Sequence, residues 1–448
     1  MSQFLEPNDR SAERQAAFES GDVPVAVYGL GKMGLPLAAV YAEVTGNVTG
    51  VDIDESVVER IRNGECPVER EPGLPELVSE LVEEGALTAS SDPTAAAADA
   101  AVHVVIVPTL VDADNQPDLS AVRSVVTDIA QGLDPGDLLI VESTLPPGTT
   151  ENVLWPLVTE ESGLNPDAFG IAFCPERTSS GRALQDIRGT HPKIVGGATR
   201  ESTQAAADIY GTLVDNDIVT VADATTAEMV KVFEGLYRDV NIALANELAR
   251  FADELDRDVR EAIAAANTQP YCDLHIPGPG VGGHCIPYYP YFVINWLTTD
   301  APLLETSRSI NDAMPGFVAD KALEGLAAKE VDADDATALV LGLTYRAGVR
   351  ETRASPAYGV CERLSDAGVD VLATDPLVSA DGFDATDVPL TEAFDSDLDA
   401  VVLVTAHEEF DAIDWDSFDE PLVVVDGRDA LELSGTDHLV YTVGRGYE

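Results

Sequence analysis

Short apolar runs alternate with helix-like segments through the first half of the chain. Apolar residues recur at helical spacing, for example, over Lys32–Thr45, Leu119–Gly132 and Thr150–Glu160. Alternation of this kind predicts βαβ units on a mostly parallel sheet. The runs of strand length lie at Val25–Tyr28, Val48–Ile53, Val102–Val107, Leu138–Val141, Ile171–Cys174 and Ile218–Val221.

The pattern changes between Ala224 and Ala266, where more than forty residues contain no strand-like run. We predict a long helix that breaks near Asp256 and is followed by a second helix. A long apolar helix between two sheet domains also indicates a dimer interface. Its apolar residues at helical spacing are Met229, Val230, Phe233, Leu236, Val240, Leu244 and Leu248.

Strand-like runs return after a glycine- and proline-rich loop, PGPGVGGHCIP, at residues 277–287. The whole pattern predicts an α/β protein with two Rossmann-like doubly wound domains joined by a central long-helix domain. Residues 1–22 are polar, and we expect them to form a loose N-terminal extension. The later runs lie at Ala338–Leu343, Val369–Ala373, Ala400–Val404 and Leu422–Val425.

The chain is strongly acidic, with 26 Lys and Arg against 80 Asp and Glu among 448 residues and a formal net charge of -54. Such a surface repels phosphates, which argues against a nucleic-acid-binding protein. A hydrophobic content of 45% leaves enough apolar material for folded cores, so disorder does not explain the charge. The excess of acid and the scarcity of lysine predict a halophilic, salt-adapted protein.

The sequence also bears on the compartment. It has no run of about 20 apolar residues that could span a bilayer, and its first residues lack an apolar signal core. The five cysteines contain no C-x-x-C pair, which argues against a disulfide scaffold or a zinc site. We therefore expect a cytoplasmic protein with no metal centre and no membrane partner.

The segment GLGKMG at residues 29–34 has the G-x-G-x-x-G spacing between a strand-like run and a helix-like segment. The glycines allow a tight turn and the close approach of a pyrophosphate to the helix N-terminus. Asp52 ends the next strand, where a carboxylate binds a ribose 2′-hydroxyl and repels a 2′-phosphate. The motif predicts NAD as cofactor; a turn with incidental glycines is the alternative. The predicted contacts in the loop are Gly29, Leu30, Gly31, Lys32, Met33 and Gly34.

Two further residues are candidates for chemistry. Cys285 lies in the glycine-rich segment GVGGHCIP, which leaves a thiol accessible and lets a ligand approach the backbone. Lys231 is one of only five lysines and lies among apolar residues of the long helix. It could stabilise a developing alkoxide, or it could be an ordinary solvated lysine. Four cysteines fit the alternative of a small buried hydrophobe, namely Cys66, Cys174, Cys272 and Cys361.

Three arginines, Arg346, Arg350 and Arg353, fall within the segment GLTYRAGVRETRASP. They form either exposed ion pairs or a clamp for phosphates or for the ribose–phosphate region of NAD. The segments ESTLPPGTT (142–150) and CPERTSSG (174–181) each follow a strand, where polar residues face the ligand crevice of a parallel sheet. They add three candidate residues: Thr144, Glu176 and Arg177.

Together these motifs closely resemble those of the nucleotide-sugar 6-dehydrogenase family, which includes UDP-glucose, GDP-mannose and UDP-N-acetylhexosamine dehydrogenases. The resemblance covers roughly residues 24–430 and includes GLGKMGLPLA, VDID, VPT (107–109), ESTLPPGTT, CPER, AEMVK, YRDVNIALANELA, GPGVGGHCIP and GLTYR followed by TRASPA. It implies an NAD-binding domain at 23–222, a central helical dimerisation domain with the catalytic cysteine loop at 223–314, and a UDP-sugar-binding domain at 315–448. It also implies a homodimer or higher homo-oligomer that makes polysaccharide or glycan precursors.

The resemblance further implies a mechanism, in which C6 of the sugar is oxidised to a carboxylate with two NAD through a thiohemiacetal and a thioester. It makes Cys285 the nucleophile and Lys231 the oxyanion stabiliser, which also contacts the substrate. Thr144 and Glu176 would lie near the attacking water and the reacting carbon. The implied substrate contacts also include Glu176, Arg177, Gly278, Gly282 and Arg346, and the implied NAD contacts include Thr109, Thr144 and Arg353.

The sequence departs from the family pattern at four positions. Tyr289 replaces an Asp four residues after the cysteine, and Gly235 replaces an Asn four residues after the lysine. Ser180 stands where some branches have a second Glu, and Tyr271 stands at the position of a subunit-crossing Arg. Loss of the Asp or the Asn would each slow the reaction about 10²–10⁴-fold unless Tyr288, Tyr289 or water replaces it.

The substrate is predicted from two segments. CPERTSSGRAL and YRDVNIALANELA are most similar to the UDP-N-acetylglucosamine and UDP-N-acetylmannosamine branches, so we expect a UDP-N-acetylhexosamine, with UDP-glucose as the second candidate. A protein of another class, a regulatory protein that binds NAD and a nucleotide sugar with impaired turnover, is the third. The retained Cys285 and Lys231 argue against it, because a binding protein needs no thiol.

Overall fold

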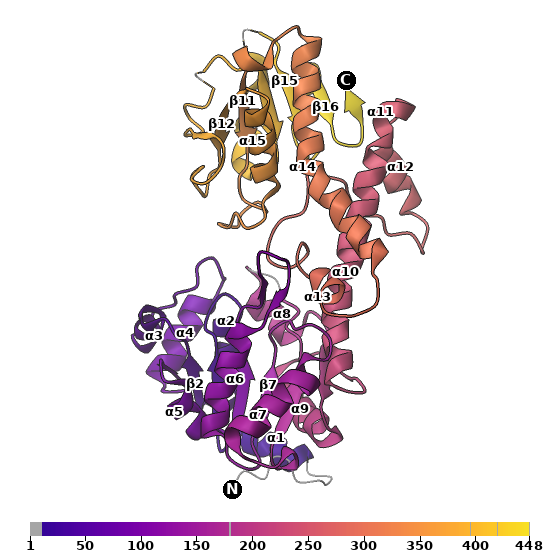
Figure 1. Cartoon of the computed structure of the whole chain (residues 1–448). Helices are drawn as coiled ribbons and strands as arrows, with labels where there is room; N and C mark the ends of the chain where they lie inside the picture. The colour runs from indigo at the N-terminus through magenta and orange to yellow at the C-terminus, as the bar shows by residue number, and fades with distance from the viewer. Residues whose placement is uncertain (1–10, 179–180, 395, 419, 448) are drawn as a thin grey trace. The chain divides into compact units, whose positions relative to one another are not determined.

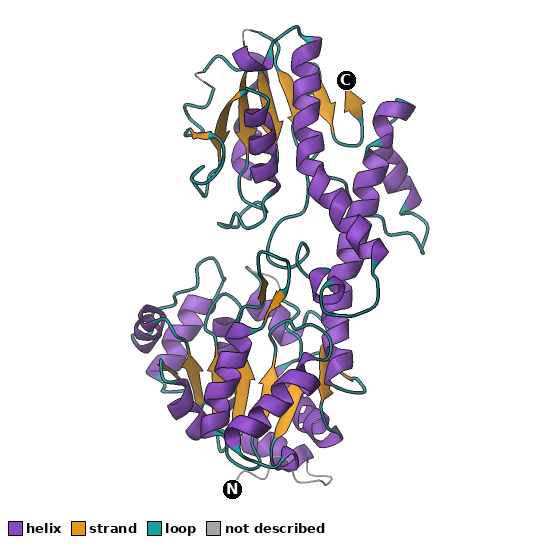
Figure 2. Ribbon diagram, viewed as in Figure 1, coloured by secondary structure: helices purple, strands orange, loops and turns teal. Residues whose placement is uncertain are grey.

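The computed structural model describes residues 11–178, 181–394, 396–418 and 420–447. The chain divides into two compact units, one made of Met1–Glu234 and Tyr291–Leu297, the other of Gly235–Pro290 and Thr298–Glu448. Each unit is built on one large, mainly parallel sheet with helices packed against it (Figure 1, Figure 2). The predicted α/β fold class is therefore confirmed.

The sheet of the first unit has the strand order β10-β9-β8-β7-β4-β1-β2-β3. Neighbouring strands are parallel except for β8 and β9. The strands are β1 (Val25–Tyr28), β2 (Val48–Val51), β3 (Leu87–Ser90), β4 (Val102–Val105), β7 (Leu138–Val141), β8 (Gly170–Phe173), β9 (Lys193–Gly197) and β10 (Ile218–Thr220), with a separate antiparallel pair of β5 (Leu110–Val111) and β6 (Pro117–Asp118).

Both faces of this sheet are buried, which explains why its strands read as continuous apolar runs. Along β1, Val25 and Val27 belong to one core cluster, and Ala26 and Tyr28 belong to another on the opposite face. The helices of the unit are α1 (Ser11–Glu19), α2 (Gly34–Thr45), α3 (Glu55–Arg62), α4 (Leu74–Glu83), α5 (Pro93–Ala98), α6 (Ser120–Gly132), the π-helical turn η1 (Thr150–Leu154), α7 (Trp155–Ser162), the 3-10 turn η2 (Pro166–Ala168), α8 (Ala183–Gly189), α9 (Arg200–Leu213) and α13 (Tyr291–Ile294).

The sheet of the second unit has the order β13-β12-β11-β14-β15-β16-β17, parallel up to β16. Its strands are β11 (Thr337–Leu341), β12 (Asp370–Thr374), β13 (Thr386–Asp387), β14 (Ala400–Leu403), β15 (Val423–Asp426), β16 (Leu439–Thr442) and β17 (Gly446–Tyr447). Its helices are α11 (Phe251–Leu255), α12 (Val259–Ala266), α14 (Pro302–Ala328) and α15 (Pro356–Asp366), with 3-10 turns η3 (Ala333–Asp335), η4 (Glu408–Ala412) and η5 (Trp415–Ser417).

The two sheets share one topology. In each, the first strand (β1 or β11) is internal, the next two lie on one side of it, and the later strands lie on the other side. The order reverses between β1 and β4 in one sheet and between β11 and β14 in the other. A ligand crevice forms at the carboxyl ends of the strands at such a point. The chain therefore has two candidate nucleotide-binding edges.

The N-terminal prediction was wrong for part of its range. Residues 1–22 were expected to be a loose extension, but Ser11–Glu19 form α1. Phe18 is fully buried, and Arg14 forms an ion pair of 2.7 Å with Asp208 on α9. A single large apolar anchor gives too weak a periodicity to predict a helix. Residues 1–10 lie outside the described part of the chain.

The predicted central region does not form a unit of its own. Helix α10 (Ala224–Ala249) supplies residues to both units, which meet in the sequence at Gly235. The boundary expected at residue 315 falls inside α14, which continues through Pro315. The predicted break near Asp256 is confirmed, since this residue ends α11 with a φ of 53°. None of the helices in the described ranges has the length and apolarity needed to cross a bilayer.

Candidate active site

The glycine loop between β1 and α2 has the geometry of a pyrophosphate cradle. Gly29 has a φ of 95°, and a Cβ on Gly34 would lie 1.8 Å from the Gly29 carbonyl oxygen. A Cβ on Gly31 would meet no protein atom within 4 Å, and Gly31 and Lys32 are exposed at the start of α2. Two glycines therefore serve the turn and its packing, whereas Gly31 leaves room for a ligand to reach the backbone.

Asp52, just after β2, is tied to this loop. Its carboxylate accepts hydrogen bonds from the backbone amides of Leu30 (2.8 Å) and Asp54 (3.0 Å). Each oxygen keeps a second lone pair, so the carboxylate can also accept from a ribose hydroxyl. The cradle, the open position at Gly31 and the acid beside them fit NAD, which the Gly31 backbone and the Asp52 carboxylate would hold.

The loops that follow β4 and β7 are joined beside the cradle. Thr109 donates its hydroxyl hydrogen to the Thr144 carbonyl oxygen at 2.6 Å. The amide of Val107 donates to the Ser143 hydroxyl at 2.8 Å, and that hydroxyl donates back to the Val107 carbonyl. The structure therefore brings together Thr109 and Thr144, which come from two separate motifs.

Glu228 was not among the residues predicted from the sequence. This fully buried carboxylate on α10 accepts from the amides of Gly148 (2.6 Å) and Thr150 (2.7 Å) and from the Thr150 hydroxyl (2.6 Å). Burial raises its pKa to about 7, although these donors act in the opposite direction. Glu228 thereby fixes the loop that carries Thr144 to the helix that carries Lys231. An acid among apolar residues in AEMVK was the available signal.

Lys231 is buried and paired, so it is not a solvated surface lysine. Its ammonium donates to the main-chain oxygen of Glu176 and lies 3.4 Å from the Glu176 carboxylate. The amide of Thr178 donates to the same carboxylate, and the Thr178 hydroxyl lies 3.0 Å from the Met33 sulfur. Lys231 and Glu176 therefore form one group linked to the glycine loop. Arg177 beside them forms an ion pair of 2.6 Å with Glu234.

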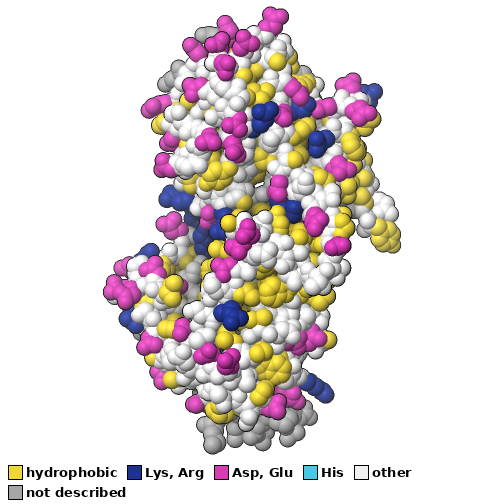
Figure 3. Space-filling model, viewed as in Figure 1, with side chains coloured by type: hydrophobic (Ala, Val, Ile, Leu, Met, Phe, Trp, Pro, Cys, Tyr) yellow, Lys and Arg dark blue, Asp and Glu magenta, His cyan; other side chains and the backbone are white. Residues whose placement is uncertain are grey.

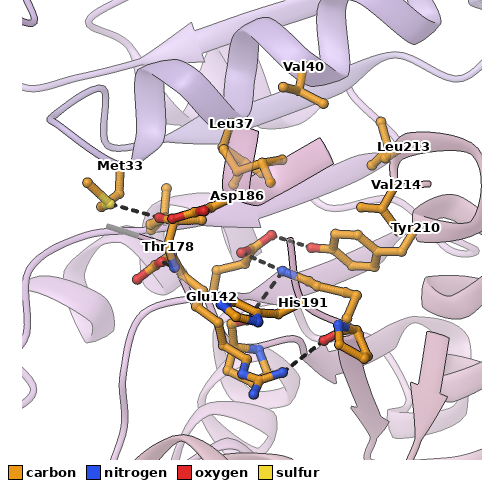
Figure 4. A pocket seen from close by; sticks show the side chains of 17 residues that line it. Met33, Leu37, Val40, Glu142, Thr178, Asp186, His191, Tyr210, Leu213 and Val214 are labelled. Carbon is orange, nitrogen blue, oxygen red and sulfur yellow. Dashed lines mark hydrogen bonds and ion pairs between the residues drawn. The ribbon is translucent and has the colours of Figure 1, made fainter. Parts of the chain in front are cut away.

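A small cavity lies behind this group, lined by Met33, Leu37 and Tyr210 among others (Figure 4). Its volume of about 30 Å³ is room for a water molecule rather than a nucleotide. At its edge the Lys193 ammonium forms a 2.8 Å ion pair with Glu142, which also accepts from the Tyr210 hydroxyl. This lysine is therefore occupied by its ion pair inside the fold.

The thiol predicted to be reactive is accessible. Cys285 is exposed, whereas Cys174 and Cys361 are buried, and burial raises the pKa of Cys361 to about 12. The structure therefore separates Cys285 from these inert thiols. The expectation of burial holds for Cys174 and Cys361, whereas Cys66 and Cys272 are half-buried.

The cysteine loop packs against the segment GLTYR…TRASP within the second unit. The Gly283 amide donates to the Arg353 carbonyl oxygen at 2.8 Å, and the His284 ring lies 3.2 Å from the Glu351 carboxylate. A Cβ on Gly282 would lie 2.7 Å from the Tyr345 Cβ. Two motifs about seventy residues apart in the sequence are therefore in contact, and the glycines are needed for that approach.

The three arginines of that segment differ in their surroundings. The Arg353 guanidinium lies 5.2 Å from the centre of the Tyr288 ring, and its Nε is buried without a hydrogen-bond partner. Arg346 and Arg350 are exposed. Of the three, Arg353 is therefore placed against the cysteine loop, and Arg346 is open to solvent on the same segment.

A further arginine was missed by the sequence analysis. Arg428 follows β15, and its Nη1 lies 2.8 Å from where a Cβ on Gly278 would stand. Its Nε donates to the Val404 carbonyl at 2.8 Å. Burial lowers its pKa to about 10, and the neighbouring Arg260 acts in the same direction. The segment DGRDAL after a strand-like run was the signal that could have identified it.

The four departures from the family pattern are placed as follows. Tyr271 is 94% exposed, and Ser180 lies outside the described residues. Gly235 and Tyr289 are in contact within the second unit.

The predicted site residues form two groups, one within each unit. The first holds the NAD loop with Thr144, Glu176 and Lys231; the second holds the cysteine loop with Gly278, Gly282 and Arg353.

Comparisons with known proteins place the chain in a family. Models of the UDP-glucose/GDP-mannose dehydrogenase family match its NAD binding domain at residues 23–214, its central domain at 225–313 and its UDP binding domain at 339–433. A UDP-N-acetyl-D-mannosamine dehydrogenase of Methanococcus maripaludis is 37% identical over 418 residues, which are 92% of this chain and 93% of the relative.

Two solved structures are similar to this chain over nearly its whole length. The UDP-D-ManNAc dehydrogenase of Pyrococcus horikoshii matches with a TM-score of 0.88 at 34% identity, over 94% of this chain and 99% of that one. The NDP-N-acetyl-D-galactosaminuronic acid dehydrogenase of Methanosarcina mazei matches with a TM-score of 0.84 at 27% identity, over 100% and 98%. The chain therefore belongs to the UDP-glucose/GDP-mannose dehydrogenase family and is an NAD-dependent oxidoreductase.

Proposed function

We propose that this enzyme oxidises the C6 alcohol of a UDP-N-acetylhexosamine to the carboxylate, with two NAD and one water, to make a precursor for polysaccharides or glycans. The observation that carries the proposal is the exposed Cys285 thiol in a glycine loop that is packed against the Arg353 segment. A dehydrogenase that stops at the aldehyde needs no thiol, whereas a four-electron oxidation needs a group that retains the aldehyde.

The proposed reaction consists of two oxidations and a final hydrolysis. NAD, when bound, accepts a hydride at each of the two oxidations. The first oxidation leaves an aldehyde, and the Cys285 sulfur forms a bond to its carbon while the oxygen takes a proton, giving a thiohemiacetal. Loss of a hydride from that carbon and a proton from that oxygen gives a thioester. Water then attacks, the carbon–sulfur bond breaks, and the carboxylate and the free thiol result.

The buried groups of the first unit have roles in this scheme. Lys231 stabilises negative charge on the substrate oxygen, and Glu176 holds the ammonium in place and orients water. Thr144, positioned through the Glu228 loop, contacts substrate and NAD. Six residues after Cys285 the chain re-enters the first unit, where the Trp296 ring nitrogen donates to the Pro147 carbonyl of that loop at 2.9 Å. This hydrogen bond fixes the segment of α13 to the loop that carries Thr144 within the first unit.

The remaining charged groups serve binding. Arg353 contacts NAD, and Arg346, with Arg177, contacts the substrate, whose diphosphate lies close to Gly278 and Gly282. We propose a UDP-N-acetylhexosamine, and UDP-N-acetylmannosamine first among them, because six relatives at 35–37% identity are named UDP-N-acetyl-D-mannosamine dehydrogenase, whereas two at 35–36% are named NDP-N-acetyl-D-galactosaminuronic acid dehydrogenase.

Assembly and environment form a second part of the proposal. Tyr237, Leu244, Phe251 and Leu255 on α10 and α11 are 43–60% exposed, and the first three are seven residues apart. A seven-residue apolar stripe on a helix favours packing against another helix, so we propose a homodimer through this face. We further propose a cytoplasmic enzyme adapted to high salt, because five free cysteines suit a reducing compartment and the net charge is -54.

The test is a stoichiometry measurement. The purified enzyme in molar KCl receives limiting UDP-N-acetylmannosamine, UDP-N-acetylglucosamine or UDP-glucose with excess NAD, and NADH and uronate are quantified. We expect two NADH per UDP-N-acetylmannosamine, and Cys285→Ser should form no acid, whereas Cys361→Ser should match the wild type. If only UDP-glucose yields two NADH, UDP-glucose is the substrate instead of a UDP-N-acetylhexosamine. If no sugar yields NADH, the chain is a binding protein. If Cys285→Ser still forms acid, Cys285 is not the nucleophile.

A further inference from the structure

Gly235 occupies an unfavourable position for a glycine. It lies in the interior of the 26-residue helix α10, where glycine costs about 1 kcal/mol relative to alanine. Its φ is not in the left-handed region, so no backbone requirement explains it. A space requirement does, because a Cβ at this position would lie 2.2 Å from Cδ2 and 3.0 Å from Cγ of Tyr289.

Tyr289 is the matching half of this contact. Its side chain is 8% exposed, and its ring lies directly against the bare backbone of α10 at Gly235. Substitution of glycine by any larger residue would force an aromatic ring, rather than the end of a flexible chain, to move. The absence of a side chain at Gly235 therefore leaves a space on α10 that the Tyr289 ring fills; we call this space the socket.

Tyr289 is also joined to the reactive loop. The amides of Tyr288 and Tyr289 both donate to the Cys285 carbonyl oxygen, at 3.1 and 3.0 Å, so the residues from the thiol to the ring form one closed turn. The Tyr288 ring lies beneath the Arg353 guanidinium. The turn is thus held by one aromatic ring against α10 and by the next against the arginine segment.

We propose that Gly235 and Tyr289 are positioning residues, and that the ring of Tyr289 in its socket on α10 sets the location of the Cys285 thiol. The inference rests on the proposed role of Cys285 and deepens it. The family resemblance implies a polar side chain at each of these two positions; in this chain the two positions form one contact, in which an aromatic ring lies against the helix backbone.

The consequence is quantitative. A Cβ at residue 235 would displace the ring by about 1 Å or more to reach ordinary contact, and a displacement of this size at a reacting group costs about 10²-fold in rate. The thiol must capture the aldehyde before the aldehyde leaves. A misplaced thiol should therefore lower kcat and let free aldehyde escape, while the KM values for NAD and the sugar change little.

The experiment is a double-mutant cycle with Gly235→Ala, Tyr289→Ala and both together, measured by kcat, KM, NADH per sugar and aldehyde trapped by a hydrazide. We expect Gly235→Ala to lower kcat about 30- to 100-fold in the wild-type background and less than about 3-fold in the Tyr289→Ala background. NADH per sugar should fall from two toward one in the single variants. Tyr289→Phe should recover at least ten-fold of the activity that Tyr289→Ala loses.

The matched control is Gly316→Ala on α14, where a Cβ would meet no atom within 4 Å; its kcat should equal that of the wild type. Additive effects in the cycle, or two NADH per sugar with no trapped aldehyde in Gly235→Ala, would overturn the inference. If Gly235→Ala does not fold, the comparison of Tyr289→Ala with Tyr289→Phe decides it. A failure of the proposed function is seen separately, as absence of turnover in the wild type.

Discussion

At the scale of single residues, this protein holds its few lysines in specific places. Lys193 pairs with Glu142, Lys231 with Glu176, and Lys321 with Asp253 at 2.8 Å. The side chains of these three lysines are 11–13% exposed. A buried ion pair is a weak source of stability but a strong constraint on position. The lysine at the proposed site is therefore prearranged by the fold.

Glu228 provides a prediction at this scale. Its two oxygens accept from Gly148 and Thr150, so Glu228→Gln would place an amide NH₂ against one of these N–H donors. We expect a loss of about 1–3 kcal/mol in the free energy of unfolding of the first unit, together with a lower kcat because the loop carrying Thr144 loosens. Urea denaturation and steady-state kinetics measure both.

The pH dependence of this residue has a definite sign. Burial raises the pKa of Glu228 from 4.5 to about 7, so its contribution to stability is full below the unfolded pKa and is lost as the pH rises through 7. Between pH 5 and 8, the wild type should lose more stability than Glu228→Gln. Glu234→Gln, on the same helix with a 41% exposed side chain, is the control and should show no such difference. Parallel pH profiles for the wild type and Glu228→Gln would contradict the prediction.

At the scale of elements, the sequence predicted the strands that read as continuous apolar runs, including the mostly exposed β10. It missed the two-residue strands β5, β6, β13 and β17 and three longer ones, β3, β9 and β16, with the sequences LTAS, KIVGG and LVYT. These three segments are short and carry polar or glycine positions that break an apolar run. Their pairing with β2, β8, β10 and β15 is decided by neighbouring strands rather than by their own residues. Helix α1 was missed for a similar reason, since one buried phenylalanine anchors it.

The exposed stripe on α10 and α11 gives the prediction for this scale. Leu244→Glu combined with Phe251→Glu places two carboxylates in the proposed dimer face, which should shift the mass from dimer to monomer in light scattering. Burying an unpaired carboxylate costs several kcal/mol, enough to dissociate a dimer at micromolar concentration. Val219→Glu on β10, at an equally exposed apolar residue, should leave the mass unchanged. A monomeric wild type would refute the proposed face.

At the scale of the whole molecule, the charge is spread over the surface. In the face shown in Figure 3, acidic side chains are scattered over both units, and Lys and Arg side chains are fewer. Both proposed ligands are anions, so the acidic surface cannot attract them. We therefore propose that binding depends on local groups such as the α2 N-terminus, Arg353 and Arg428, which offset the surrounding field at short range.

Salt dependence follows from this distribution. Because mutual repulsion among exposed carboxylates is screened by ions, raising KCl from 0.1 to 2 M should raise Tm by at least about 5 °C, which corresponds to about 2 kcal/mol for units of this size. Scanning calorimetry measures the shift. A Tm that stays constant or falls with salt would contradict the proposed salt adaptation.

A charge-reversal variant serves as the comparison. Glu76, Glu80 and Glu83 are exposed on α4, away from every residue assigned to the site. Replacing all three by lysine should raise Tm in low salt. The further rise in Tm between low and high salt should then be smaller than in the wild type. An unchanged gain would show that salt acts through another property, such as the strengthening of apolar burial.

The sequence alone determined the fold class and indicated most of the candidate site residues. Strand–helix alternation, the glycine spacing around Gly31 and the loop around Cys285 are local requirements, since a turn, a phosphate cradle and an accessible thiol each need particular residues in a short segment. Such local requirements can be recognised directly from the residues of a short segment. The untested roles of those residues remain predictions.

Only the tertiary structure decided which distant groups meet. The sequence marks Glu228 as an acid among apolar residues and Arg428 as an arginine after a strand-like run, but it does not give their partners, which lie tens of residues away. Gly235 and Tyr289 read separately as two lost polar groups, yet in space they are one contact. A packing contact needs two residues that are often far apart in the chain. The sequence gives the identity of each residue, and only the folded structure shows that the two are in contact.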